Sequence, residues 1–347
     1  MSAAQRLVGL VNRTGRVNGS PFDATRSMSP PSGRRRNWVH YGVMVPDLPE
    51  PHRSFGVMSI AGSPGVTIFA NDHAITTTPS DTVYTSSATA SMTDGQFLVH
   101  SIARDCEFAA DGSHLRFGQD LVIDGTYPRF TVRRTHPEVT VELEIEATDK
   151  VAHFANIPAM YRHWSLLSTY RGHLDYRGER VEVQGLCTVE YAAGVGMHSV
   201  TASTRPKLPA KFFTYHVLNL DHRTQALLVE VLGPAGFPIQ KSVYLRSLDG
   251  YGGVYTRGFD FRVQEYESEP RRTPDGRVMH LPKSLSWRVL DDEGRDLITI
   301  EGTAGGDYSY GLGAGFVGTY DYTGTYRGRA ITGRAYLEYI DCRRPIR

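Results

Sequence analysis

Apolar and polar side chains alternate with a period of two along most of the chain. From Thr140 to Glu146, Val, Leu and Ile alternate with glutamates, and residues 259–263 repeat the pattern with Phe, Phe and Val. Such alternation is typical of a strand with one buried and one solvated face. Residues 3–13 instead place apolar side chains on one helical face. The pattern therefore predicts a nearly all-β chain with one short amino-terminal helix.

Turn signals separate these strand-like runs, which indicates successive antiparallel hairpins. The turns are expected at Asp124-Gly125, Tyr176-Arg177-Gly178, Asp221-His222-Arg223 and Glu293-Gly294. Parallel βαβ units would need helical patterns of about 10–15 residues between the runs, and the sequence lacks them. The chain has 35 glycines, and those between Tyr308 and Tyr339 alternate with tyrosines. Glycines inside strand patterns indicate the sharp bends of coiled strands. Between a sandwich and a barrel, we therefore favour the barrel.

The length of 347 residues suggests about two domains. Residues 18–36 are rich in Ser, Pro, Gly and Arg and read as an irregular arm, so the folded body should begin near Trp38. The alternation of apolar and polar residues is interrupted at Pro158–Arg162. We expect a helix and Arg-rich arm over 1–37, a first β domain over 38–161 and a second over 162–347.

Charge and cysteine content narrow the function classes. The 38 basic and 37 acidic residues nearly cancel, which argues against nucleic acid as a partner. The Arg-rich arm leaves two interpretations open, weak contact with an anionic membrane surface or a solvated leader. The three cysteines have no paired spacing, and no apolar run approaches the ~20 residues of a membrane span, so we expect a cytoplasmic protein. The oligomeric state stays open.

Residues 164–194 contain a strand, a glycine hairpin and then Val-x-Gly followed five residues later by an acid, with Gly185 and Glu190 at the last two positions. This segment resembles the opening of the second barrel in the lipocalin-like superfamily that includes carotenoid 1,2-hydratases and tocopherol cyclases. The segment WVHYGVMVPDLPEPHRSFGVMSIAG (38–62) resembles a signature of an uncharacterised actinobacterial branch of that superfamily. The resemblance implies two tandem lipocalin-like antiparallel β-barrels, with a pocket in or between them for an isoprenoid, polyketide or other apolar molecule.

Acid-catalysed hydration or cyclisation of an alkene needs a proton donor in an apolar cavity, where burial raises the pKa of a carboxyl group. Glu190 is the candidate donor, and His198 is its candidate partner because a neutral imidazole can orient or relay a proton. The alternatives are a surface acid and a structural histidine. The chain also departs from the hydratases, because Tyr191, Ala192 and Ala193 stand where those enzymes continue with His, Glu and Trp.

Other polar and aromatic residues at strand ends, or at the expected junction, are candidate ligand-binding residues. They are Tyr41, Asp72, His73, His163, Trp164, Tyr215 and His216. Tyr215 and His216 are consecutive, so we expect one of them to point inward. For each candidate a structural role in a core, turn or stacking pair stays open.

The sequence lacks the G-x-S-x-G, Walker A and H-E-x-x-H motifs, and the GLGAG run at 311–315 is not followed by a helix. These absences set other enzyme classes aside, and the resemblance implies a hydratase-, cyclase- or isomerase-type enzyme that acts on an apolar substrate in a barrel cavity without a cofactor or metal. The alternative is a non-catalytic carrier of a hydrophobic small molecule. A third interpretation is an interaction module with filled barrels.

Overall fold

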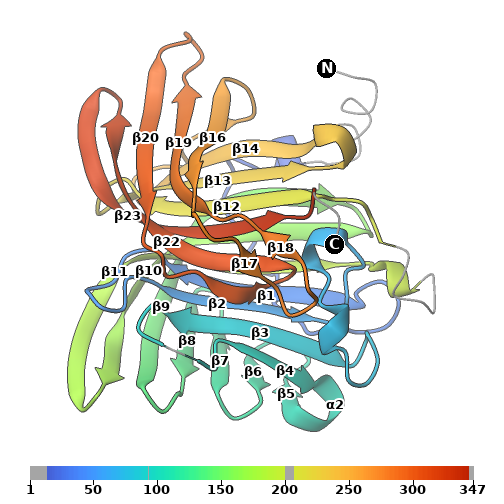
Figure 1. The fold of residues 1–347 in the computed structure, drawn as a ribbon. Coiled ribbons are helices and arrows are strands. Elements are labelled where there is room, and N and C mark those ends of the chain that lie inside the picture. Colours follow the sequence, from blue (N-terminus) through green and yellow to red (C-terminus); the bar gives the residue numbers. More distant parts are fainter. Residues whose placement is uncertain (1–13, 93, 200–206, 344–347) are drawn as a thin grey trace.

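Two large antiparallel sheets, one from each half of the chain, make up the molecule (Figure 1). The computed structural model describes residues 14–92, 94–199 and 207–343. The first sheet has 11 strands in the order β4-β3-β2-β1-β11-β10-β9-β8-β7-β6-β5 and curls into a nearly closed barrel. The second has 10 strands, in the order β15-β14-β13-β12-β23-β22-β20-β19-β16 with β21 beside β22, and forms a half-barrel. The predicted all-β fold is confirmed, whereas the helix expected at 3–13 lies outside the described residues.

The strands of the first sheet are β1 (Trp38–Val45), β2 (Phe55–Ala61), β3 (Thr82–Thr89), β4 (Phe97–Ser101), β5 (Cys106–Phe108), β6 (His114–Phe117), β7 (Leu121–Thr126), β8 (Arg129–Arg134), β9 (Val139–Ile157), β10 (Tyr161–Tyr176) and β11 (Glu179–Gly194). Those of the second are β12 (Phe212–Asn219), β13 (Thr224–Leu232), β14 (Pro238–Ser247), β15 (Val254–Tyr255), β16 (Phe259–Tyr266), β19 (Pro282–Leu290), β20 (Asp296–Ala304), β21 (Ser309–Leu312), β22 (Gly315–Tyr326) and β23 (Arg329–Asp341). A small sheet pairs β17 (Arg271–Arg272) with β18 (Val278–Met279), and the short helices are η1 (Thr14–Arg16), η2 (Thr67–Phe69), η3 (Asp72–Ala74), α2 (Ile102–Asp105), η4 (Met197–Ser199) and η5 (Pro234–Gly236).

The central strands of the first sheet are buried on both faces. Every residue of β1 and β2 is buried, and β11 changes from a largely exposed start to continuous burial from Leu186 to Gly194. By contrast, the first half of β9 alternates buried and more exposed positions, as the sequence pattern predicted. A strand needs apolar residues on both faces only where both are covered. The second sheet provides that cover.

Three apolar layers follow from this arrangement. Val39, Tyr41 and Val43 of β1 face the interior of the first barrel, and a second cluster occupies the second barrel and extends to Met58 and Ile60 of β2. The third layer lies between the sheets, and we call it the seam. It contains Met44, Ala152 and Phe154 from the first sheet and Tyr215, Val217, Leu227, Val229, Tyr244 and Tyr336 from the second. Apolar side chains cluster in both barrel interiors, and the seam is a further place where the two sheets enclose space.

Three of the four expected hairpin turns are confirmed, at 176–178, 221–223 and 293–294. The turn expected at Asp124-Gly125 is wrong, because both residues lie in β7 and the chain reverses after Thr126. Gly125 has a φ of 106°, and a Cβ there would lie 2.3 Å from the carbonyl oxygen of Arg129. The glycine therefore permits a close approach between the backbones of the paired strands β7 and β8, and it does not mark the turn.

The strand pairing does not follow the boundary expected after residue 161. β10 and β11 are hydrogen-bonded into the first sheet, and the second sheet begins at Phe212. The break in rhythm at 158–160 is a tight hairpin between β9 and β10, with Ala159 at a φ of 61°. A short turn and an interdomain linker interrupt the period of two in the same way, which is why the pattern misplaced the change of sheet.

The arm is packed and not a loose leader. Phe22 and Met28 belong to the core cluster of the first barrel, and the Phe22 ring lies 4.9 Å from that of Trp164. The Asn18 side chain bonds the backbone of His153 at both its oxygen and its nitrogen. The arm therefore closes one side of the first barrel, and its contact with a membrane surface stays a prediction.

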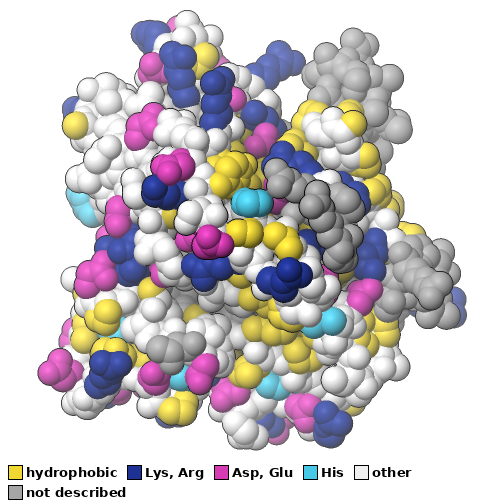
Figure 2. Space-filling view, in the orientation of Figure 1, with side chains coloured by type: hydrophobic (Ala, Val, Ile, Leu, Met, Phe, Trp, Pro, Cys, Tyr) yellow, Lys and Arg dark blue, Asp and Glu magenta, His cyan; other side chains and the backbone are white. Residues whose placement is uncertain are grey.

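Positive and negative side chains are interspersed over the face shown in Figure 2. No single sign dominates that face. Among the described residues, we find no helix that has both the length and the apolar character needed to cross a membrane.

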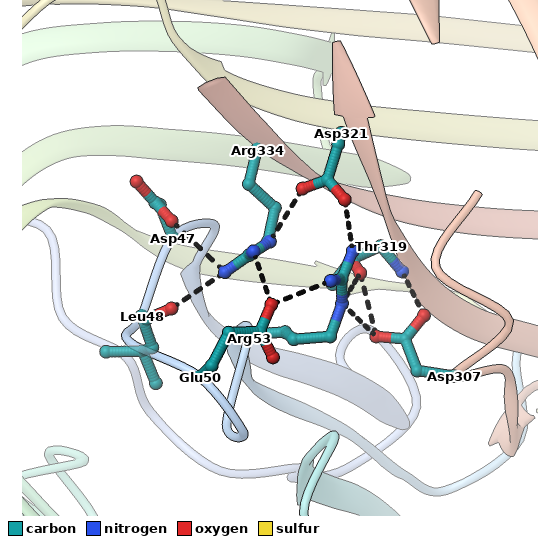
Figure 3. Close-up of polar contacts among 8 residues, drawn as sticks. All are labelled: Asp47, Leu48, Glu50, Arg53, Asp307, Thr319, Asp321 and Arg334. Carbon is teal, nitrogen blue, oxygen red and sulfur yellow. Dashed lines mark hydrogen bonds and ion pairs between the residues drawn. The ribbon is translucent and has the colours of Figure 1, made fainter. Parts of the chain in front are cut away.

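Two arginines connect the sheets at one edge of the seam (Figure 3). Arg53, in the β1–β2 loop, bonds Glu50 and Asp321 at 2.9 Å each. Arg334 of β23 bonds the same two carboxylates at 2.7 and 3.0 Å. The other groups in contact are Asp47, Leu48, Asp307 and Thr319. Because Asp321 and Arg334 belong to the second sheet, this network clamps the loop of the first sheet to it.

We expect Arg53→Ala to lower the free energy of unfolding by about 1–2 kcal/mol. The loss stays modest because Glu50 and Asp321 are more than half exposed, and solvent screens the charges. Urea denaturation at low and high salt would measure it, with Arg104→Ala as the control because Arg104 pairs only locally with Asp105. Equal losses in both variants would contradict an interdomain role for the network.

Candidate functional site

Strand register gathers two histidines and a glutamate at one place in the seam. His40 of β1 and His163 of β10 both lie opposite Ala192 of β11, one on each side. Glu190 is two residues before Ala192 and therefore lies on the same face. The small Ala192 side chain leaves room for both imidazoles, whose ring centroids are 5.6 Å apart. Three adjacent strands thus present three polar groups to one point.

The Glu190 carboxylate lies at the centre of this cluster and is 2% exposed. Its Oε2 atom is 3.9 Å from His40 Nε2 and 3.7 Å from His163 Nε2. From the second sheet, the Tyr215 hydroxyl donates a hydrogen bond to Oε1. Gly42 faces Glu190 across the β1–β11 pair, and a Cβ there would lie only 3.0 Å from His40 Nε2. The glycine therefore keeps the space beside the carboxylate open for the imidazole.

The outer ring nitrogens of both histidines have their own partners. His40 Nδ1 lies 2.9 Å from the carbonyl oxygen of Ser59. A carbonyl only accepts, so Nδ1 carries the proton, and the lone pair of a neutral ring is on Nε2, toward Glu190. His163 Nδ1 lies 3.1 Å from the Tyr161 hydroxyl, while its Nε2 makes no hydrogen bond. Both rings are thus held with Nε2 directed at the carboxylate.

Burial alone would raise the pKa of Glu190, but the neighbouring imidazoles of His163 and His40 outweigh it and hold that pKa well below its usual range. Burial lowers the pKa of His163, with Glu190 opposing the shift. Glu190 is therefore ionised near neutral pH. That state suits a proton acceptor or a metal ligand and not the proton donor expected from the sequence.

The second sheet contributes a carboxyl group in the opposite state. Glu338 of β23 lies across from Tyr215 and is 2% exposed. The Tyr336 hydroxyl donates to its Oε1 at 3.0 Å. Burial and then the negative charge of Glu190 raise the pKa of Glu338 well above its usual range, against the hydrogen bond from Tyr336. The surroundings therefore favour the ionised form of Glu190 on one sheet and the protonated form of Glu338 on the other.

A buried cation lies nearby. Arg246 of β14 is 1% exposed and donates from Nη1 to the carbonyl and hydroxyl oxygens of Ser165, at 2.7 and 3.1 Å. Its Nη2 donates to Gln225. Burial lowers the pKa of Arg246 to about 10, with Tyr215 and Glu190 opposing the shift. Ser165 is the β10 residue across from Glu190, so the guanidinium supplies positive charge near that carboxylate without bonding it.

A hollow of about 210 Å³ lies between the sheets and reaches the wall of this site. Its lining includes Gly56, Ser86 and Ala88 from the first sheet and Val317 and Tyr336 from the second. Tyr336 connects it to Glu338 through their hydrogen bond. The hollow is smaller than the ~300–1,000 Å³ of typical ligand sites. Two larger grooves, of about 760 and 910 Å³, run along β7–β11 and are lined both by charged residues, such as the Glu144–Arg171 ion pair, and by apolar residues of the first barrel core, such as Leu143 and Ile145.

Three of the predicted site residues, Glu190, His163 and Tyr215, meet in the seam. Tyr41 and Trp164 instead face the first barrel interior, and His216 faces the second. Of the consecutive pair Tyr215 and His216, only His216 points into a barrel, and Tyr215 is buried as well because β12 is covered on both faces. In each of the consecutive pairs His163–Trp164 and Tyr215–His216, one side chain faces the seam and the other faces a barrel interior.

The remaining predicted residues lie elsewhere. His198 in η4 bonds Ser63 at 3.0 Å, and among the described residues the groups in contact with the Glu190 carboxylate do not include it. The expected Glu190–His198 pair is thus not formed. Asp72 pairs with Lys207 at 2.6 Å, and the ring of His73 lies 6.2 Å from that of Tyr310.

The sequence analysis missed Glu338 and Arg246 as site residues, and of the neighbours His40 and Tyr41 it kept Tyr41, which faces the first barrel, and not His40, which faces the seam. One signal was available for His40 and Arg246, since a charged or ionisable side chain inside a continuous apolar run is unusual, as in WVHYGVMV and VYLRS. Glu338 sits in YLEYI, which also reads as a strand with one polar face. Among the described residues, His40, His163 and Glu190 also form a group able to hold a metal ion.

The fold and the seam define a protein built from two tandem lipocalin-like barrels. Two solved structures share the fold: a protein assigned as AttH from Nitrosomonas europaea (13% identity, 94% of this chain and 100% of that chain, TM-score 0.60) and kievitone hydratase from Nectria haematococca (10% identity, 92% and 93%, TM-score 0.58). No curated protein matches the chain. Residues 58–347 match the model of a family of unknown function, DUF6670, and the chain belongs to that family.

Proposed function

We propose that the chain is a hydratase- or cyclase-type enzyme that acts on an apolar substrate at the seam. The reaction adds an O–H bond, from water or from a hydroxyl of the substrate itself, across a carbon–carbon double bond, or it reverses that addition. One alkene carbon gains the proton and the other gains the oxygen. No electrons are exchanged with a second reactant.

The observation that carries the proposal is a pair of buried carboxyl groups on facing sheets, Glu190 beside two imidazoles and Glu338 beside the Tyr336 hydroxyl, whose surroundings shift their pKa values in opposite directions. Where the surroundings push the pKa values of two carboxyl groups apart, the group with the higher pKa is suited to act as the acid and the other as the base. Protonated Glu338 lies behind Tyr336 at the wall of the hollow, so it is our proposed proton donor. The Tyr336 hydroxyl passes its proton to the alkene and takes up that of Glu338, the incoming O–H adds to the cation, and the proton of that O–H returns through Tyr336 to Glu338. Ionised Glu190 and its imidazoles orient the polar end of the reacting pair.

A purely structural role explains the cluster poorly. Taking several ionisable groups out of water is costly, and apolar side chains of similar volume often stabilise a seam as well or better. Such clusters concentrate at functional sites. Kievitone hydratase shares the fold, and its name states a hydration activity for that protein. These points, with the resemblance in residues 164–194, support a hydratase-type reaction and a place beside the carotenoid hydratases in the superfamily.

We expect Glu338→Gln to accumulate substrate. Glutamine keeps the shape of a protonated carboxyl group and cannot donate its proton, so a bound apolar compound should be at least about tenfold more abundant on the variant than on wild type. Native mass spectrometry followed by denaturing extraction would measure it. Glu230→Gln is the matched control, since Glu230 is also a buried glutamate of the second sheet but pairs with Lys241.

The same measurement distinguishes the alternative. A compound retained equally by wild type, Glu338→Gln and Glu230→Gln would identify a carrier and contradict catalysis by Glu338. The replacement of the hydratase residues by Tyr191, Ala192 and Ala193 is the feature that favours a carrier. If none of the three proteins carried a bound compound, both the enzyme and the carrier interpretation of the seam would be contradicted.

A further inference from the structure

We propose that His40, His163 and Glu190 bind a divalent transition-metal ion, zinc by the chemistry of the donors, in the seam. This inference goes beyond the proposed function, because metal binding requires no reaction. It also departs from the metal-free site expected from the sequence. The donors are two imidazole nitrogens and one carboxylate oxygen, a set found in catalytic zinc sites.

The spacing of the donor atoms is close to that of a loaded site. The three atoms all lie within 4.8 Å of one another, and Glu190 Oε2 is 3.7 and 3.9 Å from the two Nε2 atoms. Zinc bound tetrahedrally at 2.0–2.1 Å would hold such atoms about 3.3–3.4 Å apart. Side-chain shifts of roughly half an ångström would close most of that difference, and the backbone register need not change.

The polar contacts leave the centre of this triangle unsatisfied. His40 Nδ1 donates to the Ser59 carbonyl, so its Nε2 lone pair faces a carboxylate oxygen that also carries only lone pairs. His163 Nε2 makes no hydrogen bond. A single proton can lie between only two of the three atoms. A cation at the centre engages all three.

The surroundings fit a metal-binding role. Histidines that bind metals usually donate their other ring N–H to a carbonyl or similar partner, and Ser59 and Tyr161 occupy those outer positions. Tyr215 occupies Oε1 and leaves Oε2 to the ion. Arg246 is bound to Ser165 and Gln225, so its guanidinium does not compete directly for the carboxylate.

The nitrogen donors select among ions. Calcium and magnesium prefer sites made entirely of oxygen, whereas imidazole suits zinc and other late first-row metals. The geometry therefore points to zinc, with cobalt(II) as a spectroscopic substitute.

The test is metal content of the purified full-length protein after incubation with excess zinc and removal of unbound ion. Inductively coupled plasma mass spectrometry should find about one zinc per chain, and cobalt(II) should give the visible absorption of a low-coordinate site. His163→Gln and His40→Gln should each lower affinity by at least about tenfold. His153→Gln is the matched control, because His153 is a buried histidine of adjacent β9 outside the triad, and it should bind as wild type does.

Gly42→Ala provides a variant that retains all three ligands. Its Cβ would lie 3.0 Å from His40 Nε2 and displace the ring, so zinc affinity should also fall. Circular dichroism would establish that each variant is folded. The proposal would be overturned if the wild-type protein bound no zinc. It would also be overturned if folded His163→Gln and Gly42→Ala retained as much zinc as the wild-type protein. Glu338→Gln should retain zinc fully, so a failure of the proposed reaction with zinc in place would count against that reaction alone.

Discussion

Trp164→Ala should lower the free energy of unfolding by about 3–5 kcal/mol. The indole is 1% exposed and lies in the first barrel interior, with ring centroids 4.9 Å from Phe22 and 5.6 Å from Tyr191. Truncation removes this contact area and leaves a cavity that the surrounding sheet cannot collapse to fill. The arm would also lose its main anchor, since Phe22 packs on this ring.

Urea denaturation followed by circular dichroism would measure the loss. Trp287→Ala is the matched control, because Trp287 is 2% exposed in the second barrel and its Nε1 lies 3.2 Å from the Tyr320 hydroxyl. If the seam couples the barrels into one cooperative unit, each variant should unfold in a single transition at lower urea. A Trp164→Ala protein as stable as wild type would show that the indole lines an open ligand space, as the sequence analysis allowed.

The strands were predictable because their pattern is local. The alternation in 140–146 and the turn residues at 176–178 each depend on a few neighbouring positions. The change of sheet between Gly194 and Phe212 was not predictable in the same way. It depends on which distant strands pair, and a tight turn at 158–160 breaks the period more visibly than the true crossover does.

The site was predictable only in part for a related reason. Glu190 was found through its resemblance to a family motif, and His163 and Tyr215 were found as polar residues in strand runs. Their assembly depends on register between β1, β10, β11 and β12, which sequence spacing does not encode. The same strands are buried on both faces, so alternation could not tell which side chain faces a barrel and which faces the seam. Burial raises the pKa of Glu338, whereas the imidazoles that the strand register places beside Glu190 lower the pKa of that carboxyl group, opposite to the shift expected from the sequence.

Acid should destabilise the protein steeply through two buried histidines outside the triad. Burial lowers the pKa of His216 to about 3, and burial together with the charge of Arg26 lowers the pKa of His153 to about 4. Both should titrate near 6.5 in the unfolded chain. Below that pH the unfolded chain binds more protons than the folded chain, so the free energy of unfolding falls as the pH falls.

Each of these histidines should remove about 1.4 kcal/mol per pH unit in the window between its unfolded and folded pKa values, or about 2.7 kcal/mol per unit for the pair between roughly pH 6 and 4. His216 bonds Thr214 and Tyr320 and packs on Phe261 and Trp287, and none of these four can supply a stabilising charge. Urea midpoints measured from pH 7 to pH 4 should therefore show a shallower slope for His216→Gln than for wild type. Phe261→Leu, a change at a side chain in contact with His216 that adds and removes no titratable group, serves as the control and should keep the wild-type slope. If His216→Gln keeps that slope too, the imidazole is already charged in the folded protein, and the second barrel interior must contain a counter-charge beyond the contacts described for that residue.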